Sequence, residues 1–287
     1  MKIRFALTTL ALAASAAAGA ACLDDAQVAA LASHYAAKTP APNFETLSDA
    51  DAACTRAKLN ALLARQLGKV AGYKAGLTNP AVQKRFNTNA PVWGVLYEGM
   101  VQPSGFTTTA AFGARPLFEA DMLVRVKDAG INQARTPWEV MQHIDQIIPF
   151  IELPDLVVQA PPKLNGAGVA AINVGARLGV AGTPIAVART RGERQQQLEA
   201  LARMQVQVRD GQGKVLSVGQ GSDILEHPLN AVSWIAQALA QEKLALKPGD
   251  LVSLGSFSPL MPPRAGLSVT VDYAGLPGAK PVQVNFQ

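Results

Sequence analysis

The stretch that decides the fold is FEADMLVRV, residues 118–126, in which apolar residues surround two acids. In a strand, residues two apart point to the same face, so Glu119 and Asp121 project together while Ala120 points away. Two adjacent carboxylates repel each other, and burial among apolar neighbours raises their pKa values unless a cation lies between them. A second apolar stretch, residues 147–153, contains Glu152, whose charge is costly to bury without a partner.

These three carboxylates have the chemistry of a divalent-metal site. Hard ions such as Mg²⁺ or Mn²⁺ prefer carboxylate oxygens and keep several waters, which leaves positions open for a chelating substrate. The same pattern also allows a structural interpretation, in which Glu119 and Asp121 lie on a solvated strand face and Glu152 pairs with a nearby arginine. The spacing alone leaves both interpretations open.

A lone lysine, Lys74, lies between glycines in GYKAGLT, residues 72–78. Glycine permits a close approach between backbone and ligand. A partly desolvated lysine there could bind a carboxylate or transfer a proton, although a surface lysine beside a turn is the plain alternative. No serine nucleophile motif, P-loop or dinucleotide fingerprint occurs in the right context, which argues against nucleotide and hydride chemistry.

The rest of the chain predicts an α+β fold with a strand-rich core. Two N-terminal helices are expected, one over residues 24–37 and one that begins after Ser48, with Asp51 completing a capping box, and ends at Gly68. Further helices are expected after Asn79, after Thr136 and over residues 228–241, and His227 is expected to cap the last of these. Strands are expected at 92–96, 117–126, 147–153, 204–208, 214–218, 251–256 and 267–273, with a hairpin turn at 210–213.

The N-terminus predicts export. Lys2 and Arg4 precede an uncharged stretch, residues 5–21, as in a secretory signal peptide, and cleavage is expected after Ala20. Lipidation of Cys22 is the alternative, but the large aliphatic residue usual before such a cysteine is absent. The expected product has no membrane span and is periplasmic or secreted. In that compartment Cys22 and Cys54 could form a disulfide or remain unpaired.

Charge and length place limits on partners and domains. The net charge of +5 comes from 26 basic and 21 acidic residues that are scattered along the chain, so no nucleic-acid surface is expected. A basic surplus favours small anionic substrates by long-range attraction. The predicted organisation is a signal peptide (1–20), an N-terminal helical cap with an α/β segment (21–105) and a β core (106–287).

Five segments in order resemble the 2-keto-4-pentenoate hydratase family, a branch of the fumarylacetoacetate hydrolase superfamily. They are residues 72–86, 118–126, 148–155, 227–239 and 246–266. The resemblance implies a mixed β-roll core and a homo-oligomer. It also implies that Glu119, Asp121 and Glu152 bind Mg²⁺ or Mn²⁺, that Lys74 and Glu152 are catalytic, and that Lys74, Asn173 and Ser256 bind substrate.

The activity implied by this resemblance is metal-dependent addition of water to a short 2-hydroxydienoic or 2-oxo-enoic acid such as 2-keto-4-pentenoate. The alternatives are a 2-oxo-3-enedioate decarboxylase of the same family and an exported, non-catalytic 2-oxo-acid binding protein. Asp121 stands where these hydratases usually have Glu. Ile172 precedes Asn173 where an Asp-Asn pair is common, so one polar group is expected to be missing near the pocket. The His-Glu dyad of the superfamily's C–C hydrolases is not found, which argues against hydrolysis.

Overall fold

The computed structural model describes residues 22–44 and 47–287. Both N-terminal helices form as predicted. Helix α1 (Asp25–Ala37) begins at Asp24, and α2 (Asp49–Leu67) begins at Ser48, whose side chain forms the predicted capping box with Asp51. The predicted signal peptide lies outside the described residues.

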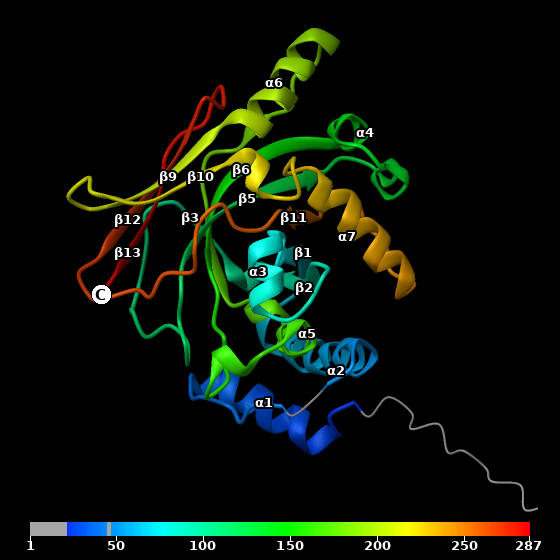
Figure 1. Cartoon of the computed structure of the whole chain (residues 1–287), viewed down its shortest axis with the longest axis vertical. Helices are drawn as coiled ribbons and strands as arrows, with labels where there is room; N and C mark the ends of the chain where they lie inside the picture. Colours follow the sequence, from blue (N-terminus) through cyan, green and yellow to red (C-terminus); the bar gives the residue numbers. More distant parts are fainter. Residues whose placement is uncertain (1–21, 45–46) are drawn as a thin grey trace, which may run out of the picture.

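The larger sheet has eight strands and carries the acidic stretches at its centre. Its order is β2-β1-β11-β5-β6-β7-β3, with β8 paired to β6, and it curls around the middle of the molecule (Figure 1). The bounds are β1 Val70–Gly76, β2 Val92–Tyr97, β3 Val101–Pro103, β5 Glu119–Val126, β6 Ile144–Leu153, β7 Leu178–Ala181, β8 Ile185–Ala186 and β11 Leu251–Ser253. Since β1 and β2 are strands of the same sheet as β5 and β6, the predicted division at residue 105 does not coincide with a boundary between sheets.

A second sheet of five strands has the order β10-β9-β12-β13-β4. Its strands are β4 Phe106–Thr108, β9 Gln205–Asp210, β10 Val215–Gln220, β12 Ser268–Ala274 and β13 Val282–Phe286, and β9 and β10 form the predicted hairpin. Tyr273 of β12 connects the two sheets. Its hydroxyl accepts a hydrogen bond from the Phe150 amide (3.0 Å) and lies within hydrogen-bond distance of the carbonyl oxygens of Asp121 and Phe150. The second sheet therefore supports β5 and β6 directly beside the acidic residues.

Helices cover the sheets from several sides. In Figure 1, α1 and α2 lie at one end of the molecule, α6 at the other, and α3 in front of the larger sheet. The remaining bounds are α3 Pro80–Arg85, α4 Pro137–Gln142, α5 Gly166–Ala171, α6 Arg191–Arg203 and α7 Asn230–Gln241. Helix α6 was not among the predicted elements. In the part of the chain that the structure describes, no helix is both long and apolar enough to span a membrane.

A disulfide joins Cys22 to Cys54, so of the two possibilities that the sequence left open, pairing is the one found. The Cα atoms of the two cysteines are 5.6 Å apart, within the usual range for a disulfide. The bridge links the chain just before α1 to the first turns of α2, and thereby fixes the first described residues to the body of the fold.

Candidate active site

The register of β5 and β6 brings the three predicted carboxylates to one face of the larger sheet. Glu119 is directly opposite Glu152 in the antiparallel pair, and Asp121 lies two residues further along β5. Directly opposite residues share a face, and so do residues two apart. The solvated-face interpretation is therefore wrong for Asp121, which is buried.

Lys74 comes to the same place from β1. It lies opposite Ser253 of β11, which is in turn opposite Leu123 of β5, so its side chain emerges on the face that carries the carboxylates. It is 2 % exposed, which excludes a surface role. Its Nζ forms an ion pair with Oε1 of Glu152 and donates a hydrogen bond to the Val174 carbonyl oxygen at 3.0 Å. Glu152 thus pairs with a lysine instead of the arginine considered from the sequence.

The glycines around Lys74 make room for protein neighbours, which differs from the predicted close approach of a ligand. A Cβ atom at Gly72 would lie 1.8 Å from the Leu251 carbonyl oxygen, in the adjoining strand β11. A Cβ atom at Gly76 would lie 2.4 Å from a methyl group of Val174. The two glycines therefore let β11 and the turn at Val174 close in on either side of the lysine.

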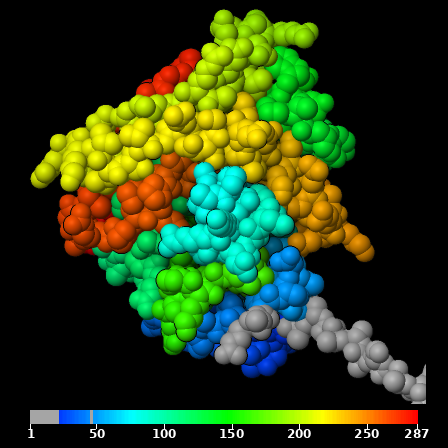
Figure 2. Space-filling model, viewed as in Figure 1, coloured from blue at the N-terminus to red at the C-terminus, as the bar shows by residue number. Residues whose placement is uncertain are grey.

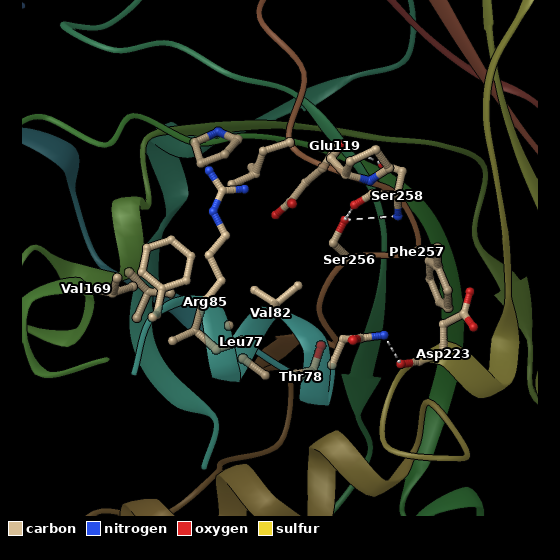
Figure 3. Close-up of a pocket in the computed structure, with 18 of the residues that line it drawn as sticks. Leu77, Thr78, Val82, Arg85, Glu119, Val169, Asp223, Ser256, Phe257 and Ser258 are labelled. Atoms are coloured by element: carbon tan, nitrogen blue, oxygen red, sulfur yellow. Dashed lines mark hydrogen bonds between the residues drawn. The ribbon is translucent and has the colours of Figure 1, made fainter. Parts of the chain in front are cut away.

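A cavity of about 410 Å³ opens in front of these residues. Lys74, Glu119 and Ser256 line it, together with polar side chains of Thr78 and Asp223 (Figure 3). Most of the remaining wall is apolar, contributed by Leu77, Val82, Phe86, Leu156, Val169, Val174, Phe257 and Leu260. A mostly apolar pocket with a few convergent polar groups is typical of a small-molecule site.

Burial and mutual repulsion raise the pKa values of two acids of this site, Glu119 and Asp121. Desolvation, with repulsion from Glu152, raises the pKa of Glu119 well above its usual value. The same two causes raise the pKa of Asp121 to about 8, against the opposing hydrogen bonds from Ser253 and the Met122 amide. This is the behaviour that the sequence predicted for closely spaced carboxylates without a cation between them.

The donor set fits a hard divalent cation, but one of the three carboxylates, that of Asp121, is turned to other partners. Oε2 of Glu152 is buried and has no hydrogen-bond partner among the described residues, and Glu119 faces the cavity. Asp121 instead accepts hydrogen bonds from the Ser253 hydroxyl and from the Met122 and Gly255 amides. As a result, no three acidic, histidine or cysteine side chains of residues 22–44 and 47–287 converge into a formed metal cluster.

Two polar expectations from the sequence need correction. The side chain of Asn173 is buried and does not line the cavity. Its amide binds the Val95 backbone instead, accepting from N–H at 2.7 Å and donating to C=O at 3.0 Å. Ile172 packs in the hydrophobic core and does not line the cavity. An apolar residue at this position therefore takes no polar group away from the cavity wall. Ser256 does line the cavity, with its hydroxyl donating to the Ser258 carbonyl at 2.6 Å.

Sequence reasoning missed Arg85, Thr78 and Asp223, which all line the cavity. Arg85 ends α3 and Asp223 ends a 3-10 turn (η5, Gly221–Asp223), so both belong to short elements that fold over the larger sheet. The signal for Arg85 was present in the sequence: it lies within residues 72–86, one of the segments that carried the family resemblance.

Comparison with known proteins agrees with this fold, although no protein-family model matches the chain. The chain is 27% identical over 262 residues to 2-keto-4-pentenoate hydratase of Burkholderia vietnamiensis (strain G4 / LMG 22486), covering 88% of this chain and 96% of the relative. It is 27% identical over 213 residues to 2-oxo-hept-4-ene-1,7-dioate hydratase of Escherichia coli, covering 71% and 75%.

Solved structures with the same fold include 4-oxalocrotonate decarboxylase from Pseudomonas putida G7, complexed with magnesium and adipate. It has a TM-score of 0.79 and 24% identity, covering 92% of this chain and 99% of that one. Fumarylpyruvate hydrolase from Pseudomonas aeruginosa, in complex with Mn²⁺ and pyruvate, is more distant, with a TM-score of 0.55 and 13% identity over 75% of this chain and 88% of that one. The fold is shared with these solved structures. Over most of its length the chain is similar to proteins named 2-keto-4-pentenoate hydratase, the family that the five sequence segments resemble.

Proposed function

We propose that the protein is a divalent metal-dependent hydratase that adds water to a short 2-hydroxydienoic or 2-oxo-enoic acid. The observation that carries this proposal is the buried Lys74–Glu152 pair. Lys74 lines the cavity, and Glu152 lies on the same sheet face as Glu119 and Asp121. The curated relatives named as hydratases support the reaction class. The metal-bound structural neighbours support a divalent ion.

Glu119, Asp121 and Glu152 would hold the ion, with Mg²⁺ or Mn²⁺ as the candidates. When bound, it supplies positive charge beside the carboxylate and 2-oxo oxygens of the substrate, where negative charge develops. The side chain of Asp121 is shorter than that of a glutamate. Its hydrogen bonds with Ser253 and two backbone amides fix the position of its carboxylate beside β5.

Lys74 and Glu152 have the chemistry for the proton transfers. The Lys74 ammonium group reaches the cavity wall, where it can bind the substrate carboxylate or donate a proton, and Glu152 can accept one. With 2-hydroxypenta-2,4-dienoate, the water oxygen adds to C4, while C3 and C5 each gain a hydrogen, formally one from the water and one from the enol hydroxyl. The product is 4-hydroxy-2-oxopentanoate.

The test is the ultraviolet absorbance of 2-hydroxypenta-2,4-dienoate mixed with the mature protein, with Mg²⁺ or Mn²⁺ added and then removed by a chelator. We expect metal-dependent loss of the dienol signal, its abolition in Lys74→Met, and no change in the matched surface variant Lys58→Met. If no 2-hydroxydienoic or 2-oxo-enoic acid is consumed by folded, metal-loaded protein, the hydratase proposal is wrong.

A decarboxylase is the second candidate, because the 4-oxalocrotonate decarboxylase fold covers nearly the whole chain. Carbon dioxide released from 2-oxohex-3-enedioate would identify this activity. Ligand binding with no product from either substrate would instead identify a non-catalytic binding protein.

We also propose that the protein is exported. The basic N-terminus and apolar stretch of residues 1–21 support this location, and so does the Cys22–Cys54 disulfide, since disulfides persist mainly in oxidising compartments. Fractionation of cells that express the full chain, with mass determination of the mature N-terminus, would test both export and cleavage after Ala20.

A further inference from the structure

The hydroxyl group of Tyr273 enters the strand ladder that carries the acidic residues. It accepts a hydrogen bond from the Phe150 amide at 3.0 Å, and it lies within hydrogen-bond distance of the carbonyl oxygens of Asp121 and Phe150. Asp121 and Phe150 face each other across β5 and β6. All the hydrogen-bond partners of this hydroxyl among the described residues are therefore backbone atoms of one facing pair.

The neighbouring residues show that these backbone groups belong to the ladder between β5 and β6. The Ala120 carbonyl accepts from the Phe257 amide (2.8 Å), and the Met122 carbonyl accepts from the Leu254 amide (3.0 Å), on the side of β5 where β11 lies. Carbonyl directions alternate along a strand, so the Asp121 carbonyl points to the other side, toward β6. The facing residues of such a pair normally exchange hydrogen bonds with each other, and here a hydroxyl from the second sheet joins them.

The packing of the Tyr273 ring does not account for the hydroxyl. The side chain is buried, and the ring contacts Phe257 edge to face, with 6.4 Å between the ring centroids. A phenylalanine would make the same contact and would leave no polar atom to satisfy in the interior. In Figure 2, the yellow β9–β10 hairpin lies against the orange to red C-terminal segments. Strand β12, which carries Tyr273, pairs with β9 on one side and with β13 on the other, so the hydroxyl projects from a strand that is held on both sides.

The ladder at this point sets the spacing of the carboxylates that would bind a metal ion. Glu119 and Asp121 belong to β5, whereas Glu152 belongs to β6, so an ion held by all three spans both strands. The Asp121 side chain is short, and three hydrogen bonds fix its carboxylate beside its own backbone. A group that fixes the backbone of Asp121 against β6 therefore also fixes the spacing of the three carboxylates.

We propose that Tyr273 is a positioning residue for the divalent ion, and that its hydroxyl holds β5 and β6 at the spacing that the three carboxylates need to bind the ion together. The inference rests on the proposed function, because it assumes that these carboxylates hold the ion. Groups that orient metal ligands without touching the metal typically contribute about 10- to 100-fold to metal affinity.

The experiment measures the Mn²⁺ dissociation constant by calorimetry for the wild type, Tyr273→Phe and Tyr97→Phe, with urea unfolding of each protein after chelator treatment. Tyr273→Phe removes one hydroxyl and keeps the ring that packs in the core. Tyr97→Phe is the matched control, because Tyr97 is also buried and its hydroxyl also donates to a backbone carbonyl, that of Asn60, at 3.0 Å. Tyr97 lies on β2, at the edge of the larger sheet and away from the β5–β6 ladder.

We expect Tyr273→Phe to bind Mn²⁺ about 10- to 100-fold more weakly than the wild type, and Tyr97→Phe to stay within about twofold of it. Each variant loses a buried hydroxyl, so the unfolding data show whether the two lose similar stability. A difference in Mn²⁺ affinity at similar stability then reports the position of the carboxylates. The inference is overturned if Tyr273→Phe binds Mn²⁺ as tightly as the wild type, or if Tyr97→Phe weakens binding equally.

Because Mn²⁺ binding requires no turnover, the result is independent of the hydratase assay. Weaker Mn²⁺ binding in Tyr273→Phe alone, together with no hydration of any dienoate, would refute the proposed function and leave the positioning role standing. Metal-dependent hydration, with equal Mn²⁺ affinity in the wild type and Tyr273→Phe, would do the reverse. A wild type that binds no Mn²⁺ would overturn the inference and the metal dependence of the proposed function together.

Discussion

At the scale of single residues, we expect both stability and activity to depend on the Lys74–Glu152 pair. Both side chains are buried, and Oε2 of Glu152 has no hydrogen-bond partner among the described residues. A buried ion pair contributes little net stability against an apolar replacement, but loss of one partner leaves an uncompensated charge in the interior. Stability and catalysis can therefore be separated at this pair by removing one charge or both.

We predict that Lys74→Met lowers the free energy of unfolding by about 3 to 5 kcal/mol in chelator-treated protein. The double variant Lys74→Met/Glu152→Gln should regain most of that loss, because no buried charge remains. Turnover should be lost in both variants, by about 10²- to 10⁴-fold or more, since the proton-transfer groups are absent. Urea unfolding and the dienoate assay measure the two effects.

The control for this prediction is Lys58→Met, at the exposed pair that Lys58 makes with Asp25 (2.8 Å). Exposed pairs contribute little because solvent screens them, so the change should be small. If Lys74→Met were no more destabilising than Lys58→Met, Glu152 would not be held as an ion by Lys74.

Much of this pair could be predicted from the sequence, but not the pairing itself. The two-residue period of a strand sufficed to place Glu119 and Asp121 on one face. Lys74 and Glu152 are separated by 78 residues and meet only because β11 and β5 lie between their strands in the sheet. Strand order is a property of the whole fold, and no local pattern around Lys74 specifies it.

At the scale of elements, the turn after α5 holds Lys74 in place. Asn173, Val174 and Gly175 all have positive φ angles (54°, 54° and 64°), a conformation that a β-branched residue such as Val174 adopts only at a cost of about 1 to 3 kcal/mol. The Asn173 side chain secures this turn against β2 through Val95. The strained turn aims the Val174 carbonyl at Lys74 Nζ.

We predict that Asn173→Ala destabilises the protein by about 2 to 4 kcal/mol, because two hydrogen bonds to the buried Val95 backbone are lost and alanine tolerates positive φ less well. Turnover should also fall, since the Val174 carbonyl no longer orients Lys74. Asn165→Ala is the control: it removes the cap of α5, at Gly168 N, and should cost about 1 kcal/mol with kcat unchanged. An Asn173→Ala variant with full kcat would show that the turn does not position Lys74.

His227 gives a prediction about pH. It is not the N-cap of α7 that the sequence predicted, because Leu229 holds that position and has no side-chain cap. The His227 ring is instead fixed just before the helix: the Leu229 amide donates to Nδ1 (3.1 Å), and Nε2 lies 3.1 Å from the Leu198 carbonyl oxygen of α6, an arrangement that needs the neutral ring with its proton on Nε2. Burial lowers the pKa of His227 below its ordinary value of 6.5. The unfolded chain therefore binds the proton first as the pH falls, and the native state loses stability.

We predict that this loss of stability begins near pH 6.5 and stops once the pH is below the folded-state pKa of His227. About 1.4 kcal/mol is lost for each pH unit between the unfolded-state and folded-state pKa values. Carboxylates change their charge in an overlapping pH range, and their effect cancels when the two proteins are compared. The quantity to measure is therefore the difference in unfolding free energy between the wild type and His227→Gln from pH 8 to pH 5. A difference that does not change with pH would mean that His227 is not held neutral.

Local signals predicted most helices, and their limits are visible at α6. Capping boxes at Ser48 and Thr136 and the proline after Asn79 correctly marked where α2, α4 and α3 begin. Thr190 caps α6 in the same manner, accepting from the Glu193 amide, but its helix is mostly polar and charged and so lacks an apolar stripe. Hydrophobic periodicity, the main signal for helices, does not detect such a segment.

At the scale of the whole molecule, we expect that the N-terminal helices can be loosened with little effect on the site. None of the cavity residues comes from α1 or α2. The disulfide from Cys22 to Cys54 spans 32 residues and encloses α1. The Leu23 amide also donates to the Thr55 hydroxyl (3.2 Å), so the same junction is held by a hydrogen bond.

We predict that the double variant Cys22→Ala/Cys54→Ala loses about 3 to 4 kcal/mol of unfolding free energy, which is the chain-entropy value for a loop of this length. Its kcat in the dienoate assay should stay within about twofold of the wild type, because no cavity residue comes from α1 or α2. Reductant should lower the thermal midpoint of the wild type toward that of the variant and leave the variant unchanged. A variant as stable as the wild type would mean that α1 is held by its packing alone. A large loss of kcat would mean that α1 and α2 act on the cavity through the sheet, and would make the N-terminal cap part of the catalytic unit.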